Sequence, residues 1–116
     1  MVTIKSFSDL PQSKKLAEIL PIESADMYWW SSGKRYYIEA MDDGDFNEGE
    51  GHIRAWSLAA LLDILAKQDF IIKSSERNDE YKYNIDIPIR HCKIWFSSLL
   101  DAAFEMVCWL KENNKL

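Results

Sequence analysis

Long apolar runs are absent from this chain of 116 residues. No stretch approaches the roughly 18 uncharged apolar residues of a membrane-spanning helix, so we expect no membrane insertion. The first ten residues also lack a basic segment followed by an apolar run, which is the pattern of a secretory signal peptide. These two absences predict a cytoplasmic protein.

Basic residues and cysteines are few. Lysine and arginine number 14 against 19 acidic residues, and the net charge of -5 repels a phosphate backbone, so nucleic-acid binding is disfavoured. The two cysteines, Cys92 and Cys108, belong to no CxxC pair or Cys/His quartet that would indicate zinc. We expect buried free thiols, as is usual in a reducing compartment, and a disulfide between them is the alternative.

Catalytic and cofactor-binding motifs are missing as well. The sequence contains no HExxH, GxSxG, P-loop or GxGxxG pattern. His52 and His91 are isolated, and Cys92, next to His91 in an expected strand, would point to the opposite face of the sheet. We therefore expect a non-enzymatic protein without a cofactor.

The apolar residues that are present, 47% of the chain, fit one domain over residues 1–116. Caps and apolar spacing predict helices at 9–20, 55–68 and 98–114, and alternation predicts strands at 27–30, 35–40, 69–75, 80–87 and 91–98. The expected fold class is α+β, a mainly antiparallel sheet of about five strands packed with three helices in the order αββαβββα.

Local signals support these elements. Ser8 and Asp9 are candidate caps of the first helix, and Ser98 with Asp101 predicts a capping box at the last one. Gly33 can supply the positive φ that a tight connection between two strands needs.

Alternation also predicts the buried faces of the strands. One face of the strand at 35–40 is expected to be buried, as is one face of the strand at 80–87. In the second of these, the expected dry face consists of Tyr81, Tyr83, Ile85 and Ile87, and the wet face includes Asn84 and Asp86.

An acidic, glycine-rich loop covers residues 42–50. Asp43, Asp45 and Asn47 have the 1, 3, 5 spacing of calcium ligands, but a glutamate occupies the position of the turn glycine and an arginine that of the closing glutamate. A solvated loop is the favoured interpretation. A metal or small-ligand site formed by this loop with His52 is the alternative.

Adjacent aromatic residues form the favoured interaction site. Tyr28, Trp29 and Trp30 follow one another in one strand, so alternation places large rings on both of its faces. With Tyr37 they form the expected contact surface, because tryptophan and tyrosine are enriched at interface hot spots. Burial of both faces is the alternative. The other tryptophans, Trp56, Trp95 and Trp109, are expected to be packing residues.

Three stretches together resemble a known group of proteins. They are SFSDLPQSKKLAEILPIESADMYW at 6–29, AWSLAALLDIL at 55–65 and DAAFEMVCWLKENNKL at 101–116. They are similar to a family of small uncharacterised proteins from gut anaerobic bacteria and their phages or mobile elements. The resemblance implies a bacterial, phage-related accessory protein, and it implies no activity, cofactor or site residue.

These observations together favour a non-enzymatic protein-protein interaction module. Its partner is expected to be another protein or a second copy, since two-fold pairing is the commonest oligomer and an unpaired strand edge could supply the contact. The alternatives are the metal or small-ligand protein described above, and an acidic mimic of nucleic acid.

Overall fold

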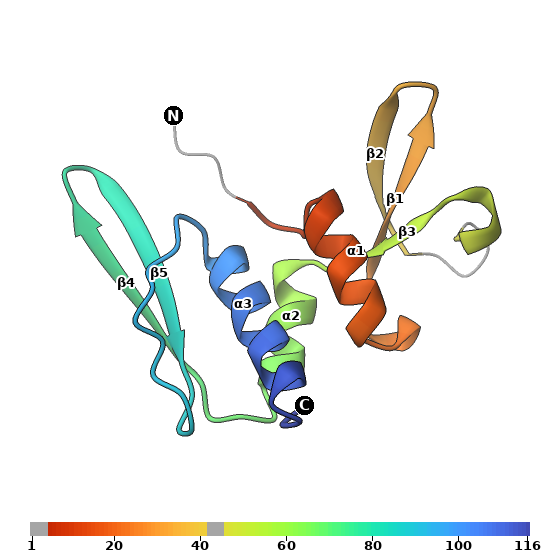
Figure 1. Ribbon diagram of the computed structural model, residues 1–116. Coiled ribbons are helices and arrows are strands. Elements are labelled where there is room, and N and C mark those ends of the chain that lie inside the picture. Colours follow the sequence, from red (N-terminus) through yellow and green to blue (C-terminus); the bar gives the residue numbers. More distant parts are fainter. Residues whose placement is uncertain (1–4, 42–45) are drawn as a thin grey trace.

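The computed structural model describes residues 5–41 and 46–116, and it places three helices between two β-hairpins (Figure 1). The helices are α1 (Leu10–Ile19), α2 (Leu58–Leu65) and α3 (Leu99–Glu112). The strands are β1 (Met27–Ser32), β2 (Arg35–Ala40), β3 (Ile53–Ala55), β4 (Ile71–Arg77) and β5 (Glu80–Asp86). Every strand pairing is antiparallel. The predicted α+β class, with three helices and five strands, is confirmed.

The strands form two sheets rather than one. The first has the order β2-β1-β3, and the second consists of the β4–β5 hairpin. Gly33, with φ +66°, starts the two-residue turn between β1 and β2, as expected. The turn between β4 and β5 consists of Asn78 and Asp79, which both have positive φ as a type I′ turn requires.

The fifth strand lies at a different place in the chain from the one predicted. It is β3, which follows the acidic loop and pairs with β1. Residues 91–98, the predicted fifth strand, are irregular apart from a single bridge between Phe96 and Tyr83. The reason is that the Asn84 side chain, rather than a neighbouring strand, donates to the carbonyl oxygens of Cys92 and Ile94.

Polar side chains cap all three helices. Asp9 accepts from the backbone N–H of Gln12, whose side chain accepts from Asp9 in return, so a full capping box begins α1. Ser57 caps α2, and Ser98 caps α3 by accepting from the Asp101 backbone. The Asp101 carboxylate bonds to other residues, so the predicted capping box at α3 is only half formed.

The core lies where the three helices meet each other and the second hairpin. Its largest members include Trp56, Leu16, Leu61, Leu65, Ile85, Ile87, Leu100 and Met106. Trp56 is fully buried and Trp109 packs against the core, as expected of packing residues. Trp95 was expected to pack too, but it is 40% exposed because the irregular segment carries it over the outer face of the β4–β5 hairpin.

Two predictions about strand faces are wrong. In β5 and the residue after it, Ile85 and Ile87 are buried as expected but Tyr81 is 50% exposed, and the expected wet residues Asn84 and Asp86 are buried. The irregular segment covers their face, since both bond to Cys92. On β2, only Ile38 is even half-buried, and this strand lies at the edge of its sheet.

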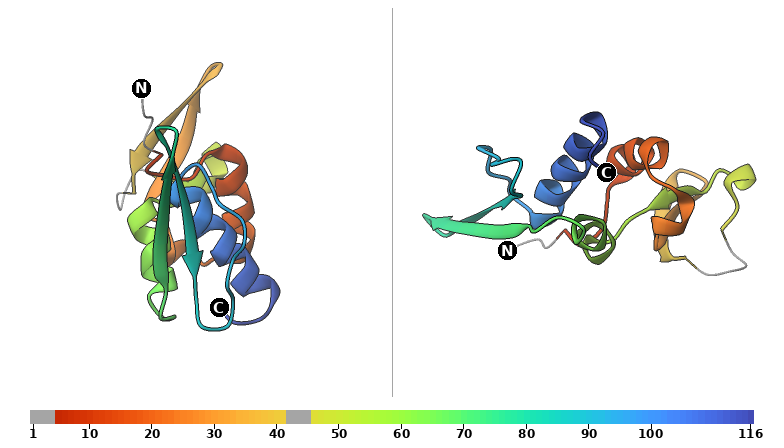
Figure 2. Two further views of the ribbon diagram at one scale, coloured as in Figure 1. Left: turned by 90° about the vertical axis from the view of Figure 1, so that its left-hand side faces the viewer. Right: turned by 90° about the horizontal axis from the view of Figure 1, so that it is seen from below.

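The molecule is flattened, with extents of 41 × 37 × 19 Å. Both hairpin turns project from the same side of the helices (Figures 1 and 2). All three helices also begin on that side and run away from it (Figure 1). Within the described residues, no helix is long and apolar enough to cross a membrane.

Candidate functional site

The aromatic residues of β1 differ in how much surface they offer. Tyr28 is only 3% exposed, because its ring stacks on His52 with 5.1 Å between ring centroids and contacts Phe46 edge-on. Its hydroxyl donates to Glu39. Tyr28 was expected at the contact surface, and the structure places it in the interior instead.

Trp29 is half-buried and anchored. Its indole Nε1 donates to the Ser8 carbonyl oxygen at 3.0 Å, and its ring contacts Phe7 edge-on at 5.7 Å. Trp30 lies on the opposite face, where its ring stacks on Tyr37 with 4.8 Å between centroids. Tyr37 is 42% exposed. Of the four expected contact residues, therefore, the Trp30–Tyr37 pair is the part that is open to a partner.

The candidate metal site is not assembled among the described residues. Asp43 and Asp45 lie outside them. Asn47 accepts from the Gly49 N–H and donates its own backbone N–H to His52 Nδ1 at 2.9 Å. His52 thus acts as a hydrogen-bond acceptor for Asn47 in the second half of the loop, with its Nε2 3.9 Å from Glu50. No group of three metal-ligating side chains occurs in 5–41 and 46–116.

Both cysteines are free and buried, as expected. Burial raises the pKa of the Cys108 thiol to about 11, so this thiol stays protonated at neutral pH. Cys92 lies in the irregular segment, where its backbone N–H donates to Asp86 at 2.9 Å. The Lys73 ammonium, 2.7 Å away, forms an ion pair with Asp86 and lowers the pKa of its carboxyl.

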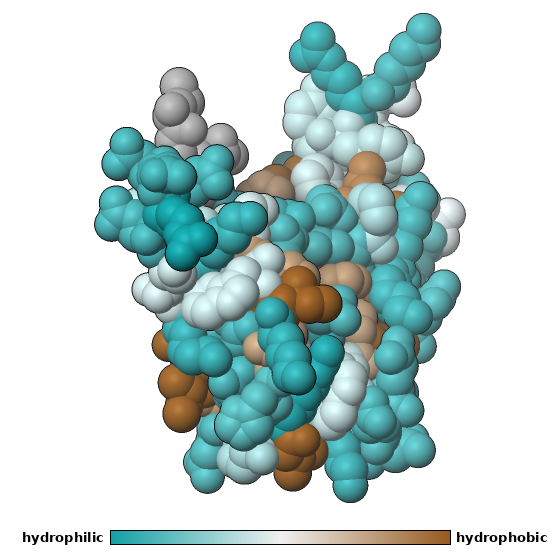
Figure 3. Space-filling model, turned by 60° about the vertical axis from the view of Figure 1, so that its left-hand side comes forward, coloured by the Kyte–Doolittle hydropathy of each residue, from teal (hydrophilic) through white to brown (hydrophobic). Residues whose placement is uncertain are grey.

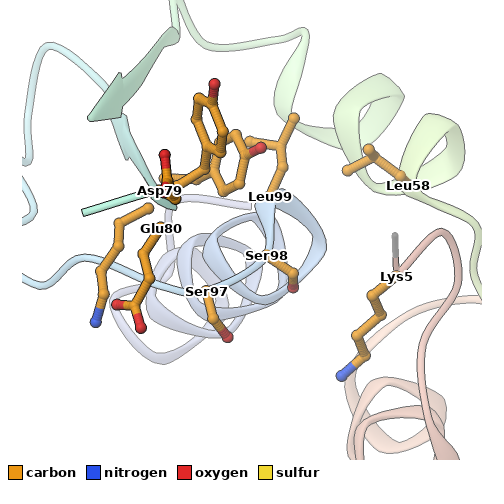
Figure 4. Close-up of a pocket in the computed structure, with 10 residues that line it drawn as sticks. Lys5, Leu58, Asp79, Glu80, Ser97, Ser98 and Leu99 are labelled. Carbon is orange, nitrogen blue, oxygen red and sulfur yellow. The ribbon is translucent and has the colours of Figure 1, made fainter. Parts of the chain in front are cut away.

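A groove follows the inner side of the second hairpin, between β5 and the first residues of α2 and α3. Its volume is about 670 Å³, which is within the usual range of ~300–1,000 Å³ for binding pockets. We call it the β5 groove. It is lined by Lys5, Leu58, Asp79, Glu80, Tyr81, Lys82, Tyr83, Ser97, Ser98 and Leu99. Figure 4 shows Lys5 and Leu58 across the groove from Asp79 and Glu80.

Lys5 is held in place at one side of this groove. Its Nζ donates to Asp9 at 2.9 Å and to Asp101 at 2.8 Å, and Gln12 also donates to Asp101. Burial opposes the charged forms of Lys5 and Asp101, but these hydrogen bonds outweigh it. The pKa of Lys5 is therefore raised and the pKa of Asp101 is lowered, so both remain charged at neutral pH.

Exposed apolar side chains gather on the second hairpin and the segment after it. Ten large hydrophobic side chains are exposed in the described residues, and six of them lie between residues 71 and 95. We call these six the hairpin apolar set: Ile71, Ile72, Tyr81, Ile89, Ile94 and Trp95. Figure 3 shows brown apolar side chains set among hydrophilic ones on this side of the molecule.

Sequence reasoning did not find the β5 groove or the hairpin apolar set. Alternation assigned Tyr81 to a buried face, because it cannot indicate how far a strand extends past the helices that cover it. One signal in the sequence could have indicated exposed apolar side chains here. Ile94 and Trp95 are adjacent, and two adjacent residues of an extended chain cannot both point inward.

Comparisons with protein-family models, with curated proteins and with solved structures find no match. The fold and the surfaces described above are therefore the basis for any statement about function.

Proposed function

We propose that this chain is a non-enzymatic accessory protein that acts by binding another polypeptide through its second hairpin. The observation that supports this most is that six of the ten large apolar side chains exposed in the described residues belong to the hairpin apolar set, in which Ile94 and Trp95 are adjacent. The resemblance to small phage-related bacterial proteins is consistent with an accessory role in the cytoplasm.

The chemistry of this surface suits a protein partner. Trp95 and Tyr81 are residue types that supply much of the binding energy at interfaces. Exposed aliphatic side chains such as Ile94, which is 58% exposed, leave apolar area in contact with water. A partner that buried this area would gain binding free energy. Lys73 lies 5.7 Å from the centroid of the Trp95 ring and fixes that ring by a cation–π contact.

The test is an affinity capture from a lysate of the source cells, comparing the wild type with an Ile94→Ser/Trp95→Ala variant. We expect a stoichiometric protein that is retained by the wild type and lost by the variant. Binding of the purified partner, measured by calorimetry, should weaken by at least about tenfold in the variant, or about 1.4 kcal/mol.

The matched control is Ile22→Ser/Leu116→Ser, which removes two exposed apolar side chains outside the hairpin apolar set. It should bind the partner as the wild type does. Retention of the same protein by the Ile94→Ser/Trp95→Ala variant, or no specific protein in the wild-type capture, would contradict the proposed function.

A further inference from the structure

The outer edge of β2 is an open strand edge. Within the described residues, β2 pairs with β1 on one side and with no strand on the other. The two-residue turn begins the β1–β2 ladder with a hydrogen-bonded pair, so Arg35, Tyr37 and Glu39 direct their backbone groups toward β1. The backbone groups of Tyr36 and Ile38 therefore point outward. Addition of a further strand to such an edge is a recurring mode of polypeptide recognition.

The side chains along this edge carry both charges and aromatic rings. Arg35, Tyr37 and Glu39 lie on one face of the strand, and Tyr36 and Ile38 lie on the other. All of them except Ile38 are exposed. Neither Arg35 nor Glu39 forms an ion pair with any described residue. The edge therefore presents one cation and one anion that an added strand can pair.

This strand is complementary to itself when two copies run antiparallel. A two-fold axis at Tyr37 places Arg35 of each copy directly across from Glu39 of the other, so the ion pair is made twice. The two Tyr37 side chains then face each other, and Tyr36 faces Ile38 on the other face of the sheet. Opposite charges and aromatic residues directly across a ladder are the pairs that stabilise strand pairing.

Only one register of two β2 strands has this property. An axis at Tyr36 would set Arg35 across from Tyr37, and an axis at Ile38 would set Tyr37 across from Glu39. Neither alternative places opposite charges across from each other. The charge pattern of the strand therefore selects the axis at Tyr37.

The other hairpin does not share this pattern. Its strand β4 also lies at a sheet edge. On β4, however, Glu76 points to the opposite face from Lys73 and Arg77, so no antiparallel register of two β4 strands sets opposite charges across from each other. Self-complementarity is a particular property of β2, and an exposed strand edge does not have it in general.

We propose that a second copy of this chain is the partner of the first hairpin, with the two β2 strands paired antiparallel about Tyr37. The two sheets then join into one sheet of order β3-β1-β2-β2-β1-β3. The Trp30–Tyr37 stacks of both copies, with 4.8 Å between centroids within each copy, form one aromatic row on a single face. This hairpin projects beyond the helices (Figure 1), and residues 31–37 are all exposed. The surface is separate from the hairpin apolar set, so the inference does not depend on the proposed function.

Single charge reversals on β2 test this pairing. Arg35→Glu sets glutamate across from glutamate at both contacts, and Glu39→Arg sets arginine across from arginine. By sedimentation equilibrium, we expect a concentration-dependent dimer of the wild type and at least about tenfold weaker self-association of either variant, because two attractive pairs become repulsive. Both positions are exposed, so the fold, checked by circular dichroism, should persist.

Restoring the charge pairs should restore the dimer. A mixture of the Arg35→Glu and Glu39→Arg variants has opposite charges at both contacts, so we expect a one-to-one heterodimer although neither variant dimerises alone. The exchanged variant Arg35→Glu/Glu39→Arg should form a homodimer as the wild type does. The control Arg77→Glu reverses an exposed charge on β4 and should leave the wild-type dimer intact.

A disulfide locates the two-fold axis. Residues that face each other in a non-hydrogen-bonded antiparallel pair have Cα atoms about 4.5 Å apart, within the range of ~4.4–6.8 Å that a disulfide spans. Tyr37→Cys should therefore form a covalent dimer on mild oxidation. Tyr36→Cys is the matched control and should not, because Tyr36 faces Ile38 and not its own copy. The two native cysteines are buried.

A wild type that stays monomeric at every concentration, or a mixture of the two charge-reversed variants that does not associate, would overturn this inference. Cross-linking of Tyr36→Cys without cross-linking of Tyr37→Cys would reject the axis at Tyr37. None of these results bears on the proposed function, which the capture with the Ile94→Ser/Trp95→Ala variant tests separately.

Discussion

Asn84 is a single buried side chain that replaces a strand. It is fully buried, and its Nδ2 donates to the carbonyl oxygens of Cys92 at 2.6 Å and Ile94 at 2.8 Å. These bonds hold the irregular segment over the outer face of the β4–β5 hairpin, and so they position Ile94 and Trp95 at the surface. Removing this side chain is costly, because the Cys92 carbonyl oxygen would stay buried without its donor.

We expect Asn84→Ala to lower the free energy of unfolding by about 1–3 kcal/mol, since the buried Cys92 carbonyl oxygen loses its donor. Urea denaturation measures this loss. The control is Asn113→Ala, which removes a bond of similar geometry to the Trp109 carbonyl at an exposed helix end and should cost less than about 1 kcal/mol. Equal losses in the two variants would show that Asn84 does not hold the segment.

The roles of single residues were predicted correctly from the sequence where those roles depend only on residues nearby in the chain. Asp9 and Gly33 act within a few residues of themselves, as cap and turn, and both were found. Asn84 and Tyr28 depend on segments distant in the chain, the irregular segment and His52, and both were assigned to the wrong environment. The residues next to Asn84 and Tyr28 in the sequence form no pattern that indicates these partners.

At the scale of the element, α2 depends strongly on its N-cap residue, Ser57. It has only eight residues, and Ser57 accepts from the Ala60 backbone while both its hydroxyl and its backbone N–H bond to Asp26. Asp26 directly precedes β1, so the cap of this helix also ties it to the first hairpin.

We expect Ser57→Ala to destabilise the protein by about 1–2 kcal/mol, because the helix loses its cap and Asp26 loses one of its two donors on Ser57. Ser57→Thr keeps the hydroxyl and should recover most of this loss. Thermal and urea unfolding of both variants measure the difference. If Ser57→Thr proves as unstable as Ser57→Ala, the cap is not the source of the effect.

Helices were easier to predict than strands for a physical reason. Leu58, Leu61 and Leu65 define a helical face by their own spacing, and the structure packs that face into the core. A strand needs a partner. The three residues of β3 carry little pattern and become a strand only by pairing with β1, whereas residues 91–98 are apolar enough for a strand but find side-chain donors instead.

At the scale of the whole molecule, Lys5 joins the N-terminal segment to α1 and α3. Its ion pair with Asp101 links residues 96 positions apart in the chain. Because the pKa of Asp101 is lowered in the folded protein, its contribution to stability is present above the ordinary carboxyl range near pH ~4 and is lost as pH falls through the folded value. The pKa of Asp86 is lowered as well, so its contribution to stability depends on pH in the same way.

We therefore expect the free energy of unfolding to fall between about pH 5 and pH 2. Asp101→Asn should cost up to about 1 kcal/mol at pH 7 and show a flatter decline in acid. Asp63→Asn, on the exposed face of α2, is the control and should follow the wild-type curve. Urea titrations at each pH measure the slopes. An Asp101→Asn variant with the wild-type slope would show that this carboxylate carries none of the acid sensitivity.

The two-residue turns have a consequence for the rate at which the chain folds. Both hairpins join strands that are neighbours in the sequence. Most strand pairs can therefore form by closing only a short loop of chain. Such hairpins form in roughly 1–10 μs, and chains dominated by local pairing reach the native state quickly. The slower step is left to the contacts between segments distant in the chain, such as the packing of α1 on β3 and on α3.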